Sequence, residues 1–242
     1  MPELLAKQVS QDLRKLSDKE VAKNLSWFFK TGKGEYGEGD KFLGIKVPQS
    51  RTIAKKYAAL PLTEIENLAK SAYHEERFTA VVILVNQFKK KISDADKKKY
   101  FDFYLKLINA GSVNNWDLID VSAPYLGSYL LDKPDPLTLL KKLATSRNLW
   151  NQRASIMLTW PLIRKGSLDE TFEIVRGFLT HRHDLIHKAC GWMLREAGKR
   201  NITELRQFLD SHAEVMPRTM LRYAIEKMGD VERKKWLSRG VN

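Results

Sequence analysis

The stretch Arg153-Ala154-Ser155-Ile156-Met157-Leu158 decides the fold, because its pattern returns twice further along the chain. Related stretches begin at Lys188 and at Tyr223, so that the alanine recurs at positions 154, 189 and 224. A large apolar residue follows each alanine by four positions, which places both side chains on one face of a helix. A small residue on such a face allows a neighbouring helix to approach closely. A repeat of about 35 residues therefore predicts a stack of helical pairs.

The same pattern occurs upstream at residues 79–84, about two repeats before the first copy, and the copy between them falls near 120–123. These alanine-bearing segments are predicted to be the second helices of their pairs. No useful length of sequence alternates between apolar and polar residues with period two, so strands are not expected and the chain is predicted to be all-α. The first helices of the pairs are predicted at 94–107, 137–144, 169–179 and 202–212.

The whole chain, residues 1–242, is predicted to form a single repeat domain. Residues 1–60 form its helical N-terminal part, and residues 61–242 form the helical pairs. Four of the ten residues in 31–40 are glycines, which favours a loop. No Gly-Lys-Ser or Gly-Lys-Thr follows a strand there, so this is not a phosphate-binding loop of the nucleotide-hydrolase type. It is either a flexible connector or an irregular strap that touches a ligand at one edge of the array.

The charge balance points to a nucleic-acid partner. The chain has 42 Lys and Arg against 29 Asp and Glu, a net charge of +13 and an isoelectric point near 9.7. Neutralising phosphates supplies most non-specific affinity for nucleic acids, although a basic surface that binds nothing gives the same numbers. The longest apolar run, 80–85, is too short to span a membrane, and Cys190 is the only cysteine. We expect a cytoplasmic protein without disulfides, associated with the nucleoid when it is bound to DNA.

Three tryptophans each have a charged residue three or four positions later on the same helix face. They are Trp116 with Asp120, Trp150 with Arg153, and Trp192 with Arg195. A face that collects indoles, two guanidinium groups and a carboxylate is poor core material, but it suits a polyanion that also offers aromatic bases. The other three tryptophans, Trp27, Trp160 and Trp236, are interpreted as packing residues.

One cluster combines residue types that bind metals, namely His181, His183, His187 and Cys190. A helix would place several of these side chains on one face, but no glutamate follows His183 as in the His-Glu-x-x-His zinc motif. We therefore interpret the segment as a basic helix start and expect neither a metal nor a cofactor. His74-Glu75-Glu76 is interpreted in the same way, as a helix N-terminus where acidic residues suit the helix dipole.

Several segments resemble the AlkD family of DNA glycosylases, which excise alkylated bases and are built from HEAT-like helical repeats. Residues 116–120 match the family's Trp-Asp-x-x-Asp segment, 150–154 its Trp-x-Gln-Arg-Ala segment, and 191–196 its Gly-Trp-x-Leu-Arg-Glu segment. Residues 42–48 and the glycine-rich stretch before them are similar to the family's N-terminal part. The resemblance therefore covers nearly the whole chain.

The resemblance implies a right-handed superhelix of HEAT-like antiparallel helix pairs with a concave, basic face. It assigns the catalytic cleft to Asp120, Trp116 and Trp192. The predicted DNA-binding residues are Arg153, Arg195, Lys188 and Phe28. Two positions depart from the family pattern: Asn115 stands where active members often carry an aromatic residue, and Phe28 replaces a tyrosine that lines the cleft. Both departures bear on lesion preference and rate.

The predicted function is that of a monomeric glycosylase acting on duplex DNA. It would hydrolyse the N-glycosidic bond of cationic alkylated purines such as 3-methyladenine and 7-methylguanine, for base excision repair. Such a base leaves as a neutral molecule, so the site has only to stabilise an oxocarbenium-like sugar, which Asp120 does by charge and the indoles by their electron-rich faces. The alternatives are a HEAT-like DNA-binding protein without catalysis and a protein–protein scaffold. The scaffold leaves the basic charge without a role.

Overall fold

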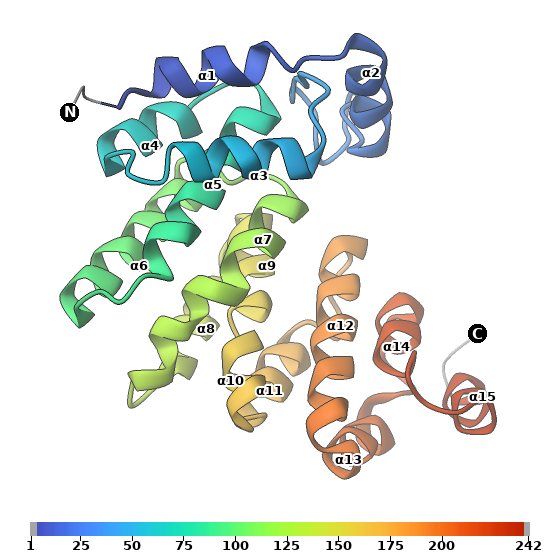
Figure 1. The fold of residues 1–242 in the computed structure, drawn as a ribbon. Coiled ribbons are helices and arrows are strands. Elements are labelled where there is room, and N and C mark those ends of the chain that lie inside the picture. Colours follow the sequence, from blue (N-terminus) through green and yellow to red (C-terminus); the bar gives the residue numbers. More distant parts are fainter. Residues whose placement is uncertain (1–3, 240–242) are drawn as a thin grey trace. The chain divides into compact units, whose positions relative to one another are not determined.

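The computed structural model describes residues 4–239, and within that range the regular secondary structure is helical throughout (Figure 1). Extended pairing is limited there to one isolated bridge between Lys41 and Tyr73. The all-α prediction is confirmed. The chain divides into two compact units, residues 1–122 and 123–242. The single domain, the right-handed twist and the basic face stay predictions.

The first unit is organised around one long helix, α5 (His74–Phe88). It packs against α1, α3, α4 and α6, and nearly all of its side chains are buried, because neighbours cover it on several sides. The apolar run that begins at Ala80 supplies the centre of this core. The other helices of the unit are α1 (Ala6–Arg14), α2 (Lys19–Phe28), α3 (Val47–Lys56), α4 (Leu62–Ala69), α6 (Asp94–Asn109) and the first part of α7 (Trp116–Leu126).

The second unit is organised around α12 (Asp184–Arg200), which packs most extensively against α14 (Arg218–Ala224), beside it in Figure 1. Gly191 allows this close packing, since a Cβ there would lie 2.4 Å from the carbonyl oxygen of Met220. The helices α9, α10, α11 and α13 also contact α12. The remaining bounds are η1 (Gly127–Asp132, a 3₁₀ helix), α8 (Pro136–Ala144), α9 (Leu149–Met157), α10 (Trp160–Lys165), α11 (Asp169–Gly177), α13 (Ile202–His212) and α15 (Asp230–Ser238).

The helices predicted from the repeat are present, and the four alanines that defined them are buried: Ala80, Ala154, Ala189 and Ala224. The segment 154–165 differs, because its helix ends at Met157 and a separate short helix, α10, begins at Trp160. Pro161 accounts for the break. It has no N–H to donate to the carbonyl of Met157, but it is well tolerated in the first turn of a new helix.

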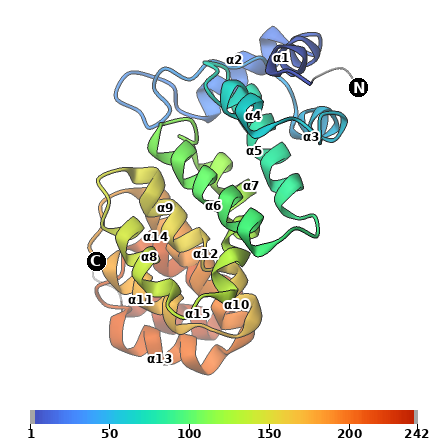
Figure 2. The same cartoon turned by 90° about the vertical axis from the view of Figure 1, so that its left-hand side faces the viewer.

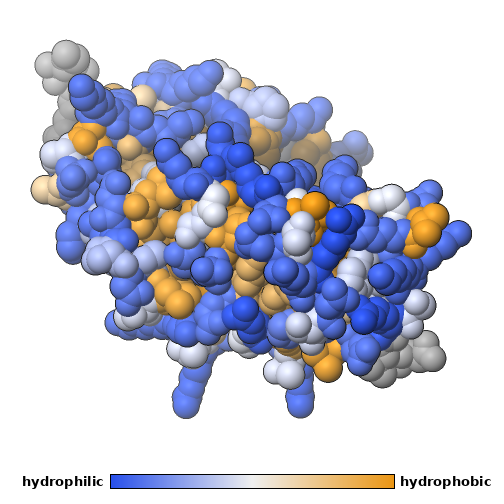
Figure 3. All heavy atoms as spheres, turned by 90° about the horizontal axis from the view of Figure 1, so that it is seen from below, coloured by the Kyte–Doolittle hydropathy of each residue, from blue (hydrophilic) through white to orange (hydrophobic). Residues whose placement is uncertain are grey.

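The face drawn in Figure 3 is mostly hydrophilic, with smaller hydrophobic areas between the polar side chains. The large apolar residues are mainly buried inside each unit. Figure 2 shows the helices of both units in a view turned by 90° from that of Figure 1. No helix within residues 4–239 combines the length and the apolar composition that crossing a membrane requires.

Candidate functional site

In the first unit, Trp116 and Asp120 lie one turn apart on α7, and both are half-buried. The indole of Trp116 stacks on the ring of Phe29, with centroids 5.4 Å apart and an angle of 17° between the planes. Phe28 approaches the same indole edge-on at 6.1 Å and is itself 55% exposed. The buried Phe29 ring thus supports the indole, while Phe28 extends the aromatic surface toward solvent.

A buried ionic network holds the beginning of α7. His74 lies between two carboxylates: its Nε2 is 2.8 Å from Oδ2 of Asp117 and its Nδ1 is 3.2 Å from Oδ2 of Asp40. Arg77 donates to the other oxygen of Asp40 at 2.7 Å. Because these groups come from the glycine-rich loop, α5 and α7, the network joins three segments that are remote in sequence.

Trp116 is fixed by its two chain neighbours as well as by Phe29. Asp117 bonds to His74, while the amide nitrogen of Asn115 donates to Asp40 at 3.3 Å. The side-chain oxygen of Asn115 accepts the backbone N–H of Trp116 at 2.8 Å. Asn115 is fully buried. The position where the resemblance implied a second aromatic therefore anchors α7 to the loop that ends in Asp40.

The carboxylates keep His74 positively charged at neutral pH. Burial works against its protonated form, but Asp117 and Asp40 outweigh burial and raise the pKa of His74 from 6.5 to about 9. Burial likewise favours the neutral form of Asp40. His74 and Arg77 outweigh that effect and lower the pKa of this carboxyl below its usual 3.8. The rings of Phe29 and Phe42 each lie 4.8 Å from the His74 ring.

The two glutamates after His74 connect further segments. Glu75 is buried and accepts the backbone N–H groups of residues 43, 44 and 45 at 2.8–3.1 Å. Glu76 accepts from Arg14 at 3.1 Å. This segment is a helix start, as predicted, and it is also a buried hub. The sequence signal was the run of four ionisable residues, 74–77, placed directly before the most apolar stretch of the chain.

The glycine-rich loop is tied to this hub. Asp40 ends it, and Lys41 forms the isolated bridge with Tyr73. Gly37 makes a close approach that excludes any larger residue, since a Cβ there would lie 2.3 Å from the carbonyl oxygen of Phe29. These contacts favour the strap interpretation over the flexible connector, although a ligand contact by the loop stays a prediction.

In the second unit, the predicted DNA-binding residues already have partners within the protein. Arg153 is 4% exposed and donates from Nη1 to the carbonyl oxygen of Leu185 at 2.5 Å. Arg195 pairs through Nη1 with Glu226 and through Nε with Glu196. Lys188 pairs with Asp184 at 2.7 Å. Any phosphate contact by Arg195 or Lys188 must therefore compete with a carboxylate.

The tryptophans of the second unit differ in exposure. Trp192 is half-buried and meets Trp160 edge-on, with centroids 5.8 Å apart. Trp150 differs from the prediction that it shares the DNA-facing surface, because it is only 8% exposed and belongs to the core. Trp160 was interpreted as a packing residue, but it is partly exposed and lines a cavity.

The prediction for Trp27 is wrong, whereas that for Trp236 is confirmed. Trp27 is 83% exposed, and it lies on α2, a helix that buries none of its side chains fully. Trp236 is 2% exposed and is the buried residue of α15.

The histidines near 181–187 make local bonds. His183 caps α12, its Nδ1 accepting the N–H of Leu185, which confirms the helix start. Nε2 of His181 lies 3.1 Å from Oε1 of Gln152, and Nε2 of His187 contacts the carbonyl oxygen of His181. Cys190 is fully buried, and burial raises the pKa of its thiol. Within residues 4–239, no three His, Cys, Asp or Glu side chains are close enough to hold a metal ion.

Comparison with known proteins gives the family. A family model described as DNA alkylation repair enzyme matches residues 9–228. The chain belongs to this family. A solved structure described as a predicted DNA alkylation repair enzyme from Enterococcus faecalis has the same fold, with a TM-score of 0.69 and 20% sequence identity over 88% of this chain and 97% of that chain. No curated protein matches the sequence significantly.

Membership of the DNA alkylation repair enzymes supports an enzymatic role in the repair of alkylated DNA. Trp116, Asp120 and Phe28 lie in the first unit, whereas Trp192, Arg153, Lys188 and Arg195 lie in the second. Their assembly into one cleft stays a prediction, and so do their individual roles.

Proposed function

We propose that this DNA alkylation repair enzyme is a glycosylase that releases cationic alkylated purines, such as 3-methyladenine and 7-methylguanine, from duplex DNA. One observation carries the proposal: a half-buried carboxylate, Asp120, stands one turn from a half-buried indole, Trp116, on a helix whose beginning is held by a buried ionic network. The enzyme acts as a monomer without a metal or cofactor, in the cytoplasm and on the nucleoid.

The chemistry needs few groups. Alkylation of a ring nitrogen makes the purine positive, so that it leaves as a neutral base without protonation by a general acid. Breaking the bond leaves positive charge on the sugar, and this charge is what the enzyme has to stabilise. Asp120 does so electrostatically and orients the attacking water, while the faces of Trp116 and Trp192 attract the same charge.

The electrostatic contribution is large enough to matter. Two opposite unit charges about 4 Å apart attract by about 4 kcal/mol at an effective dielectric constant of about 20. A difference of that size between ground and transition state corresponds to about a thousandfold in rate. This is useful for a glycosidic bond that the positive charge of the base has already weakened.

DNA binding is assigned to Arg153, Arg195, Lys188 and Phe28. Lys188 and Arg195 exchange a carboxylate for a phosphate when DNA binds, whereas the buried Arg153 acts by holding the beginning of α12 through the carbonyl of Leu185. Phe28, next to Trp116, offers an exposed ring to the sugar or base.

The direct test is base release. Purified protein is incubated with a duplex containing 7-methylguanine, and free base is measured by mass spectrometry against the spontaneous rate without protein. We expect release well above the spontaneous rate, and the same rate in excess chelator, because the proposed mechanism uses no metal. Salt-sensitive duplex binding without any base release would instead indicate a DNA-binding protein without catalysis.

A further inference from the structure

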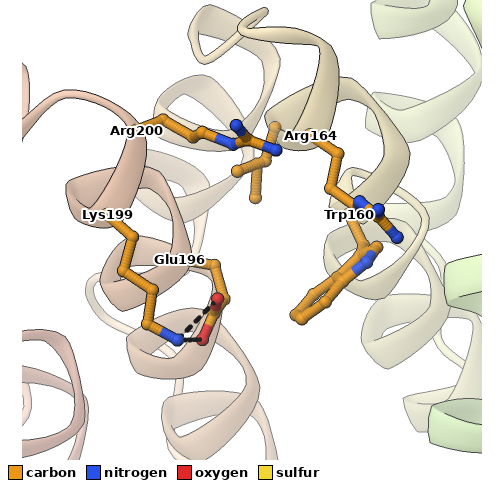
Figure 4. A pocket seen from close by; sticks show the side chains of 6 residues that line it. Trp160, Arg164, Glu196, Lys199 and Arg200 are labelled. Atoms are coloured by element: carbon orange, nitrogen blue, oxygen red, sulfur yellow. Dashed lines mark hydrogen bonds and ion pairs between the residues drawn. The ribbon is translucent and has the colours of Figure 1, made fainter.

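A second feature of the second unit suits an anion. A cavity of about 330 Å³ opens between α10 and α12, and it is lined by Trp160, Ile163, Arg164, Glu196, Lys199 and Arg200. Figure 4 shows Arg200 extending from α12 toward α10 and Arg164 lying beside the Trp160 indole, with this indole opposite the Glu196–Lys199 pair. None of these residues belongs to the predicted catalytic or DNA-binding set.

The charges lining this cavity do not balance. Lys199 is paired with Glu196, which accepts from its Nζ at 2.7 and 2.9 Å and also lies 3.4 Å from Nε of Arg195. Within residues 4–239, Arg164 and Arg200 have neither an ion-pair nor a hydrogen-bond partner. The cavity therefore presents two guanidinium groups with all their donors available. Their planar geometry fits two oxygens of one phosphate.

Basic residues in the last turn of a helix commonly compensate the helix dipole, and all three cations lie in such turns. Compensation of the helix dipole does not account for Arg164 and Arg200. Each helix C-terminus contributes only about half a negative charge, so two of them reduce the excess without cancelling it. Arg164 and Arg200 also make no hydrogen bond to the terminal carbonyls, which a capping side chain does.

The cavity continues the surface that carries Trp192. On α12, Trp192, Glu196 and Lys199 recur at intervals of four and three residues and therefore share one face. Trp160 touches the edge of Trp192 and also forms a wall of the cavity. A ligand that lies along Trp192 and extends toward the end of α12 thus reaches Arg164 and Arg200.

We propose that this cavity binds a backbone phosphate of the DNA strand, held between Arg164 and Arg200, with the neighbouring deoxyribose against the indole of Trp160. The identity of the ligand as DNA rests on the proposed function, but the binding of undamaged duplex does not depend on catalysis. Glu196 keeps Lys199 in place beside the phosphate and limits the cavity to one anionic group.

The test compares two double variants that lower the net charge equally. Arg164→Gln with Arg200→Gln removes the cavity cations, while Arg176→Gln with Arg206→Gln removes two exposed arginines that pair with carboxylates on α11 and α15. Binding to an undamaged duplex is measured by fluorescence anisotropy over a salt series, after melting curves show that both variants are folded. We expect the cavity variant to lose about tenfold in affinity and about one unit of salt slope, and the control to change less than twofold.

Equal losses in the two variants would overturn the proposal, because they would show a general effect of charge. Inorganic phosphate provides the second arm. If it raises the melting temperature of the wild type but not of the cavity variant, while duplex affinity is the same in both, the cavity binds free phosphate and the assignment to the DNA backbone is wrong. Base release is measured separately. The comparison of duplex affinities can therefore be interpreted even if the protein releases no alkylated base.

Discussion

Two groups of positively charged side chains, one in each unit, are placed in opposite ways. In the first, His74 and Arg77 are almost fully buried, and both are paired with carboxylates. In the second, Arg164 and Arg200 face an open cavity and have no partner among residues 4–239. A buried charge is costly unless it is paired, so the first arrangement fixes the positions of the segments that carry it. An exposed, unpaired charge costs little and remains available to a ligand.

This difference separates positioning from binding. The buried network joins the glycine-rich loop to the beginning of α7, and hence to Trp116, which lies between Asn115 and Asp117. Substitutions that disrupt the buried network should therefore lower the unfolding free energy first. Loss of the exposed cations should appear as lost DNA affinity in a protein that is still stable.

The largest effect is expected for Asp40→Ala. It leaves the His74 and Arg77 charges short of a carboxylate inside the protein, which costs about 3–5 kcal/mol of unfolding free energy. Chemical denaturation at pH 7 measures this loss. Asp94→Ala is the control, because that carboxylate is 84% exposed and its removal should cost less than about 1 kcal/mol. A loss for Asp40→Ala no larger than for this control would show that the network does not hold the unit together.

The pH dependence of stability gives the next effect. The pKa of His74 is raised in the folded protein, so its contribution is fully present below about pH 6.5 and disappears as pH rises through about 9. We expect the unfolding free energy to fall by up to about 3 kcal/mol over this window. His181 and His183, whose pKa values are lowered mainly by burial, titrate below the window.

Denaturation of wild type and His74→Gln at several pH values from 6 to 9.5 isolates this contribution. The His74→Gln variant should be less stable than wild type at pH 6. Its unfolding free energy should change little between about pH 6.5 and 9. A wild-type curve with no decline up to pH 9.5 would contradict the raised pKa.

The smallest effect concerns Glu226, which pairs with Arg195. Glu226→Gln weakens the competition for Nη1 of Arg195, whose Nε still lies near Glu196, and removes a charge that repels phosphate, so duplex binding should tighten by about two- to threefold at low salt. Glu232→Gln is matched, because it frees Arg206 on α13. Anisotropy at fixed salt compares the two variants. Equal tightening would mean that Arg195 has no special place on the DNA-binding surface.

The repeated helices were predictable because the period of about 35 residues is local and regular. Ala154, Ala189 and Ala224 are buried where the pattern placed them. The break before Trp160 was not predicted, although Pro161 provides its cause. The sequence did not predict the exposure of Trp27, because how far the side chains of α2 are buried depends on what packs against this helix, which the local sequence does not show.

The candidate site was predictable only in part. Trp116 and Asp120 follow from helical spacing. The network that holds them does not, because Asp40, His74 and Asp117 are separated by 34 and 43 residues and meet only in the folded unit. The cavity at Arg164 and Arg200 depends in the same way on the packing of α10 against α12.

The central claim is that the Asp120 carboxylate stabilises the positive charge that develops on the sugar. Asp120→Asn keeps the shape of the side chain and removes the charge. Single-turnover release of 7-methylguanine should fall by about a hundredfold or more, while the melting temperature and the affinity for undamaged duplex stay close to wild type or the affinity rises slightly. Release at the wild-type rate by a folded Asp120→Asn protein would contradict the mechanism.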